Sequence, residues 1–96
     1  MTIDFTKNGE ILLVNLEGRL DTQTAPEFEN FLKTNLQGAD SVEINCEKLT
    51  YVSSAGLRVL LSAHKRMMGA VTFTNVCELV MEVFEITGFV DILNIK

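Results

Sequence analysis

The sequence contains no long apolar run, only one histidine and two cysteines, and fewer basic than acidic residues. A helix that crosses a bilayer needs about 20 apolar residues in succession, and no stretch of this chain approaches that length. The N-terminal Met1–Phe5 has neither the basic start nor the apolar core of a signal peptide. We therefore expect a cytoplasmic protein that does not insert into a membrane.

The shortage of basic residues bears on the kind of partner. The chain has 8 lysine and arginine residues against 13 aspartate and glutamate residues, which gives a formal net charge of −5. Nucleic acids are bound by basic surfaces, because these neutralise the phosphate backbone. The charge balance therefore argues against nucleic acid as a partner.

Residues that carry catalysis or hold metals are scarce as well. Cys46 and Cys77 lie far apart, without a C-x-x-C pattern or a nearby histidine pair, which favours two buried thiols over a metal site or a disulfide. His64 follows Ser54 by ten residues on a predicted helix. The helical rise places these two residues about 15 Å apart, too far for a nucleophile and its base. No glycine-rich phosphate loop occurs, so we expect no enzyme and no cofactor.

The residues that are present form the pattern of one α/β domain over residues 1–96. Hydrophobic residues make up 47% and charged residues 22%, the balance of a soluble globular domain. Ile3 and Phe5 alternate with polar residues, and Asn8-Gly9 predicts a type I′ hairpin into a second strand. That strand, Ile11–Leu16, is apolar at nearly every position, which is typical of a strand buried on both faces.

The rest of the chain alternates helices and strands. Thr24 and Glu27 predict a capping box, with Pro26 in the first turn of a helix that ends at Gly38. The order predicted after it is strand 42–46, helix 54–68, strand 71–76, helix 78–87 and strand 92–95. Strand–helix–strand units favour right-handed parallel crossovers. We therefore predict a small mixed sheet with helices packed on it, which begins with an antiparallel hairpin and continues as β-α-β-α-β-α units.

Two predicted loops, residues 18–23 and 47–53, follow neighbouring strands. Binding sites in parallel α/β sheets collect beyond the carboxyl ends of the strands, so we expect the two loops to lie side by side. The second loop leads into a helix, with Ser53 as its N-cap and Ser54 exposed in its first turn. Gly56 is a poor helix former, and we expect it to permit the close approach of another backbone. These residues form the candidate site.

The same residues carry a resemblance to a known family. Residues 51–60, Tyr-Val-Ser-Ser-Ala-Gly-Leu-Arg-Val-Leu, resemble the phosphorylation-site signature of STAS-domain anti-sigma factor antagonists, whose usual form is Asp-Ser-Ser/Thr-Gly-Leu-Gly-Val. Residues 18–25 resemble the Gly-x-Leu-Asp loop of that family, residues 42–49 its third strand, and residues 83–89 its C-terminal helix and stop. The four stretches follow the order of the family and span nearly the whole chain.

This resemblance implies a protein that binds an anti-sigma factor, which is also a serine kinase of the histidine-kinase-like ATPase type, and thereby frees a sigma factor for transcription. Phosphorylation of the antagonist ends the binding, and a serine phosphatase restores it. The phosphorylated serine of the family falls on Ser54, with Ser53 as the lesser candidate. The implied partner-binding residues are Leu20, Asp21, Thr22, Ser53, Ser54, Ala55, Gly56 and Arg58.

The signature also departs from the pattern of the family. The family's aspartate is Ser53 here, and its second serine or threonine is Ala55. The alternative is therefore a STAS interaction module that is not phosphorylated and works in another signalling complex or beside a transporter. A small-molecule or nucleotide-binding module is a third interpretation, since a helix N-terminus attracts anions. The negative charge of the chain and its lack of a basic clamp disfavour that interpretation.

Overall fold

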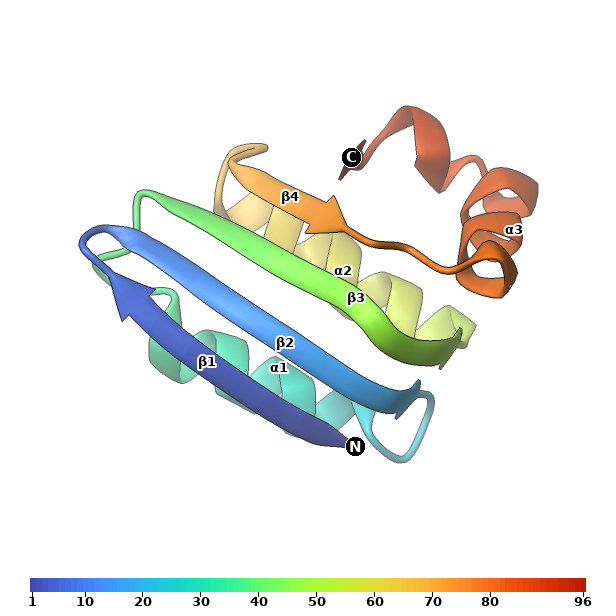
Figure 1. Cartoon of the computed structure of the whole chain (residues 1–96), viewed down its shortest axis with the longest axis horizontal. Helices are drawn as coiled ribbons and strands as arrows, with labels where there is room; N and C mark the ends of the chain where they lie inside the picture. Colours follow the sequence, from blue (N-terminus) through green and yellow to red (C-terminus); the bar gives the residue numbers. More distant parts are fainter.

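A computed structural model describes residues 1–96 as a five-stranded sheet with three α-helices (Figure 1). Strand β1 is antiparallel to β2 and the other neighbouring strands are parallel, in the spatial order β1-β2-β3-β4-β5. The predicted mixed sheet is confirmed, and none of the helices is long and apolar enough to cross a bilayer. The elements are β1 (Thr2–Asn8), β2 (Ile11–Leu20), α1 (Ala25–Asn35), β3 (Ser41–Val52), α2 (Ser54–Arg66), β4 (Val71–Thr74), α3 (Glu78–Thr87), the 3-10 turn η1 (Phe89–Asp91) and β5 (Asn94–Ile95).

The hairpin between β1 and β2 forms where the sequence predicts it, but with a different turn. Asn8 pairs with Ile11, so the loop consists of Gly9 and Glu10. Gly9 has a φ of +65°, whereas Glu10 does not have a positive φ. A positive φ at the first loop residue alone is the pattern of a type II′ turn. The prediction of a type I′ turn centred on Asn8-Gly9 is therefore wrong, and the turn lies one residue later.

Helices α1 and α2 both lie on one face of the sheet, behind the strands in Figure 1. Strands β2, β3 and β4 follow one another both in sequence and in space, and right-handed crossovers that advance in one direction place their helices on one face. Phe28 and Leu32 of α1 and Leu57 and Leu60 of α2 are buried in the core there. Strands β2 and β3 contribute Leu12, Val14, Leu16, Leu20, Val42, Ile44, Cys46, Leu49 and Val52, and β4 contributes Val71 and Phe73.

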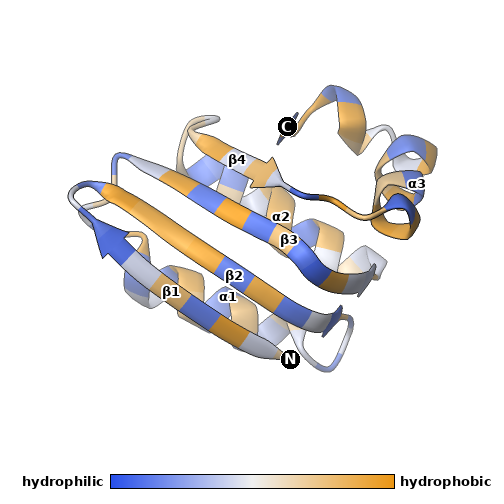
Figure 2. Ribbon diagram, viewed as in Figure 1, coloured by the Kyte–Doolittle hydropathy of each residue, from blue (hydrophilic) through white to orange (hydrophobic).

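The opposite face of β2 is not covered by these helices, so the prediction that this strand is buried on both faces is wrong. Along β2 the buried residues alternate with Ile11 and Asn15, which are exposed, and Leu13, which is half-buried. In Figure 2 the first half of β2 is continuously apolar. Its composition is therefore that of a doubly buried strand, although its packing is one-sided.

A row of three asparagines crosses this uncovered face. Asn45 Nδ2 donates to Asn15 Oδ1 over 2.9 Å, and Asn75 Nδ2 donates to Asn45 Oδ1 over 2.9 Å. The backbone N–H of Glu47 also donates to Asn45 Oδ1, over 3.1 Å. This asparagine row links β2, β3 and the end of β4 through side chains, in addition to the backbone ladders.

The two cysteines are free thiols. Cys46 is buried, and this burial raises the pKa of its thiol to about 12, with a smaller contribution from Cys77. Cys77 is only half-buried, and its Sγ donates to the Leu49 carbonyl over 3.4 Å. The expectation of two buried thiols is thus confirmed for Cys46 alone.

Candidate partner-binding site

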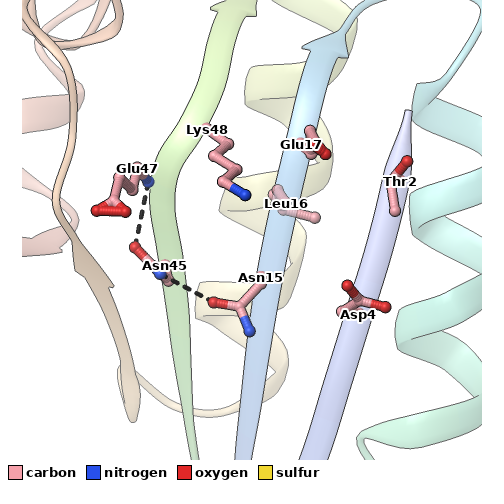
Figure 3. Close-up of a pocket in the computed structure, with 8 residues that line it drawn as sticks. All are labelled: Thr2, Asp4, Asn15, Leu16, Glu17, Asn45, Glu47 and Lys48. Atoms are coloured by element: carbon pink, nitrogen blue, oxygen red, sulfur yellow. Dashed lines mark hydrogen bonds between the residues drawn. The ribbon is translucent and has the colours of Figure 1, made fainter.

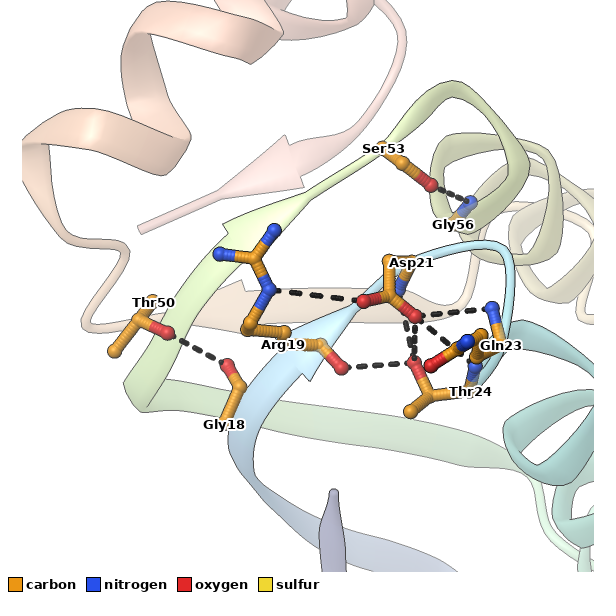
Figure 4. A network of polar contacts seen from close by, with 8 residues as sticks. All are labelled: Gly18, Arg19, Asp21, Gln23, Thr24, Thr50, Ser53 and Gly56. Carbon is orange, nitrogen blue, oxygen red and sulfur yellow. Dashed lines mark hydrogen bonds and ion pairs between the residues drawn. The ribbon is translucent and has the colours of Figure 1, made fainter.

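The candidate site lies where β2 and β3 end and α2 begins (Figure 4). The two segments predicted as loops are mostly strand, because β2 runs to Leu20 and β3 to Val52, and the strands stay paired as far as those residues. Two register shifts between Asn15 and Arg19 interrupt the pairing, and such bulges bend a strand and re-aim its side chains. The expectation that the two segments are neighbours is confirmed, and the expectation that they are loops is wrong.

Several contacts hold the ends of these strands together, among them a hydrogen bond of 3.0 Å from Thr50 Oγ1 to the Gly18 carbonyl. The Arg19 guanidinium lies 4.3 Å from the centroid of the Tyr51 ring, within the range of a cation–π interaction. The Ser53 N–H donates to the Leu20 carbonyl over 2.9 Å. The contact between Ser53 and Leu20 ties the start of α2 directly to the end of β2.

Asp21 builds the turn between β2 and α1. Its Oδ1 accepts hydrogen bonds from the N–H groups of Gln23, over 3.0 Å, and Thr24, over 3.1 Å. In return, Thr24 Oγ1 accepts from the Asp21 N–H over 2.8 Å and donates to the Arg19 carbonyl over 2.8 Å. Arg19 Nε lies 3.6 Å from Asp21 Oδ2. The Asp21 carboxylate therefore holds the turn in place, although Asp21 is only half-buried.

This reciprocal pair replaces the predicted capping box. Thr24 has helical φ and ψ angles of −96° and −18°, and its side chain makes no capping hydrogen bond to α1. The box of Thr24 with Glu27 is therefore a wrong prediction, although Pro26 does lie in the first turn. Asp21 and Thr24 make the same kind of reciprocal bonds three residues earlier, because an aspartate satisfies the N–H groups of a turn as a capping serine or threonine does.

The pKa of Asp21 gives this turn a predicted pH dependence. The hydrogen bond from the Thr24 N–H, assisted by the Gln23 N–H and by Arg19, holds the pKa of the carboxyl below its ordinary value. A carboxyl with a lowered folded-state pKa stabilises the fold above its unfolded pKa, and this contribution is lost as the pH falls through the folded value. We expect the stability advantage of the wild type over Asp21→Asn to hold near neutral pH and to shrink below about pH 4.

Urea unfolding of both proteins across this pH range measures the effect. Asn is a matched control for Asp21, since its side-chain oxygen still accepts from both N–H groups but does not titrate. An advantage of the same size at acidic and neutral pH would contradict the prediction.

Ser53 and Ser54 play different roles at the start of α2. Ser53 is the N-cap, with φ and ψ of −90° and 177°, and its Oγ accepts from the Gly56 N–H over 3.2 Å. Ser54 is the first residue of the helix and is exposed. The predicted cap and the predicted exposure are both confirmed. The Ser53 hydroxyl is thus engaged within the domain, whereas Ser54 faces solvent.

Gly56 is the point where α2 touches the end of β2. A Cβ atom at this position would lie 2.6 Å from the Leu20 carbonyl oxygen, 2.8 Å from Leu20 Cγ and 3.1 Å from Val52 Cγ1. The predicted close approach of another backbone is therefore confirmed. Leu20 and Gly56 are themselves buried, so neither presents a side chain to a partner. Both act by setting how closely α2 packs against the end of β2.

A groove of approximately 380 Å³ runs between α1 and α2 and brings together three of the predicted partner-binding residues, Thr22, Ala55 and Arg58. Sequence reasoning missed the other residues that line it. For Val59 and Ser62 the signal was their spacing from Ala55, since the three residues recur at intervals of four and three residues, which places them on one helix face. The missed residues are Ala25, Pro26, Glu29, Val59 and Ser62.

A second hollow, of approximately 310 Å³, lies on the uncovered face of the sheet (Figure 3). It contains none of the predicted partner-binding residues, although Glu47 and Lys48 come from the segment 47–53 that the sequence placed beside them. Its three carboxylates outnumber its single lysine, so it lacks the basic clamp of an anion site, and no group of three or more histidine, cysteine or acidic residues is arranged to hold a metal ion. The lining residues are Thr2, Asp4, Asn15, Leu16, Glu17, Asn45, Glu47 and Lys48.

Comparison with known proteins agrees with this architecture. The STAS domain family matches residues 2–96 of the chain. The anti-sigma-B factor antagonist of Bacillus subtilis is 30% identical over 100 residues, an alignment that covers 100% of this chain and 91% of that protein.

Two solved structures share the fold. The anti-sigma factor antagonist SpoIIAA in its unphosphorylated form superposes with a TM-score of 0.74 at 15% identity, covering 99% of this chain and 87% of that one. The Bacillus cell fate determinant SpoIIAA in its phosphorylated form superposes with a TM-score of 0.74 at 16% identity, covering 99% of this chain and 91% of that one. At these identities the likeness concerns the fold alone. With the family match and the B. subtilis relative, the chain belongs to the STAS domain family, among the anti-sigma factor antagonists.

Proposed function

We propose that this chain is an anti-sigma factor antagonist that binds an anti-sigma factor with serine kinase activity, and that phosphorylation of Ser54 releases it. The kinase is of the histidine-kinase-like ATPase type, and a serine phosphatase restores binding. The observation that carries the proposal is the exposure of Ser54 at the start of α2, beside a Ser53 hydroxyl that is engaged in the cap. The chain is itself no enzyme in this cycle, which regulates sigma-dependent transcription in the cytoplasm.

The partner-binding surface in this proposal is formed by side chains on both sides of Ser54. Asp21 and Thr22 contribute from the turn before α1, and Ala55 and Arg58 contribute from the first two turns of α2. Arg58 is exposed, and it stands at the position where the family signature has its second glycine. The groove between α1 and α2 extends this surface away from the serine.

The comparisons support the proposal in two ways. The B. subtilis relative is named for antagonism of an anti-sigma factor. SpoIIAA has been solved in an unphosphorylated and in a phosphorylated form, and this chain superposes on each structure with the same TM-score of 0.74. A switch of this kind therefore needs no change of architecture in the antagonist, only a change in the surface that the partner meets.

The second candidate function is a STAS interaction module that is not phosphorylated. The departures at Ser53 and Ala55 favour it, since a kinase that reads the family's aspartate would meet a serine here. The negative net charge argues against nucleic acid as a partner in either candidate function. The two candidates differ in one covalent property, the phosphate on Ser54.

The deciding experiment isolates the protein with its bound partners from its native cells and locates phosphate by peptide mass. We expect phosphate on Ser54, and an ATPase-type kinase that co-purifies with the unmodified form only. A Ser54→Ala chain is the matched control, because it should keep the kinase and carry no phosphate. A stable partner with no phosphate under any growth condition would discard the switch and leave the interaction module.

A further inference from the structure

Helix α3 carries an apolar stripe on its outer face. Ile86 is 85% exposed and Leu79 is 53% exposed, and residues seven apart lie on the same side of a helix. Val83, which is half-buried, falls between them. Isolated exposed apolar residues are ordinary, whereas adjoining ones with a polar rim form the kind of patch that interaction sites use. We refer to Leu79, Val83 and Ile86 as the α3 stripe.

The charges around the α3 stripe are all of one sign. Glu78, Glu82 and Glu85 are exposed on the same helix, and Asp91 follows in η1. Between residues 67 and 95 the chain contains no lysine, arginine or histidine. The α3 stripe is therefore bordered by carboxylates that no basic residue of this segment neutralises.

The inner face of α3 fixes the α3 stripe in its outward position. Val80 and Phe84 are fully buried, and the Phe84 ring meets the Phe73 ring of β4 edge-on at 6.3 Å between centroids. Figure 1 shows α3 beside the end of β4, away from α1. Because the helix is anchored on its other side, it cannot rotate to bury Ile86 without exposing these two core residues.

We propose that the α3 stripe is a docking surface for an amphipathic helix of another protein, with lysine or arginine residues beside its own apolar face. The apolar side chains meet along the stripe, and the basic residues meet the three glutamates. A second copy of this chain is disfavoured, because a symmetric pairing would bring the same carboxylates face to face. An anionic membrane surface is disfavoured by the same repulsion. The surface acts independently of Ser54.

A test uses synthetic helices of about 15 residues, roughly four turns, built from leucine and lysine, with leucine–glutamate and scrambled leucine–lysine peptides as controls. Each is titrated into the isotope-labelled full chain and followed by amide chemical shifts. We expect saturable binding of the leucine–lysine helix alone, with shifts confined to residues 78–92. Ile86→Glu should weaken this binding about tenfold, since one isoleucine side chain loses its burial.

The variant separates apolar docking from simple charge attraction, because Ile86→Glu adds a negative charge as it removes the apolar contact. Met68→Glu makes the same change at an exposed methionine outside α3 and should leave the affinity unchanged. Glu82→Lys should weaken binding of the lysine helix, because it replaces one of the carboxylates that its basic residues meet. Equal or tighter binding by Ile86→Glu, shifts on the sheet face, or an Ile86-dependent dimer or vesicle complex would each overturn the proposal.

Discussion

Replacement of Ser54 by aspartate is expected to weaken binding to the partner by more than about a hundredfold, equivalent to about 3 kcal/mol, while thermal unfolding stays nearly unchanged. The two effects separate because of where the residue lies. In the first turn of α2 a negative charge meets the unpaired N–H groups and the positive end of the helix dipole, so the domain tolerates it. At the interface the same charge must lose its water.

Asp21 adds to this penalty. It follows Leu20, whose carbonyl accepts the N–H of Ser53, so its carboxylate belongs to the same end of the sheet. Its lowered pKa keeps it charged at neutral pH. A phosphate, with a charge of about −1.5 to −2, should therefore weaken binding further than aspartate does.

The measurement is calorimetric titration of the partner that co-purifies with the unmodified chain. Asn30→Asp is the matched control, because it adds one charge at an exposed position of α1 that does not line the groove. We expect this control to bind as the wild type does. If Ser54→Asp lowers the melting temperature strongly while the affinity for the partner is unchanged, the serine is structural and the switch is refuted.

Replacement of Gly56 by alanine is expected to destabilise the domain by about 2 kcal/mol, the cost of forcing one extra carbon into a packed site. The added Cβ would lie 2.6 Å from the Leu20 carbonyl oxygen. That oxygen is backbone, and it is held by the hydrogen bond from Ser53, so it cannot rotate away as a side chain would. The gain in helix propensity, about 1 kcal/mol, offsets only part of the strain.

Such a loss corresponds to a fall in melting temperature of roughly 10 °C for a domain of this size, which calorimetry resolves easily. Ser54→Ala is the control, since it changes an exposed residue in the same helical turn and should shift stability by less than about 0.5 kcal/mol. Gly56→Ala should also bind the partner less well, because the added carbon forces α2 and the end of β2 apart. A Gly56→Ala protein as stable as the wild type would show that the close approach imposes no constraint.

The elements that local signals define were predictable from the sequence. Helix α3 has the predicted bounds, 78–87, because its apolar period and the glycine that follows agree. Gly88 adopts a φ of +80°, the left-handed stop that such a glycine predicts. Ser53 and Gly56 were also placed correctly, since an N-cap serine and a glycine at a close contact can both be recognised from the residue type and its position.

The ends of β2 and β3 were not predictable, because their pairing depends on a partner strand about thirty residues away in the chain rather than on their own composition. Gly18 and Lys48 there are of residue types that are depleted in strands. The capping error at Thr24 has a different cause. Two overlapping patterns, Asp21 with Thr24 and Thr24 with Glu27, obey the same rule, and only the conformation that the chain adopts after β2 selects the first.

The asparagine row gives the uncovered face of the sheet a polarity. Asn75 donates to Asn45 and Asn45 donates to Asn15, so the three amide dipoles align in one direction and reinforce one another. Reversal of the middle amide alone would set donor against donor and acceptor against acceptor. The row therefore behaves as one oriented unit, and it ends at Asn15, whose register partner on β1 is Asp4 (Figure 3).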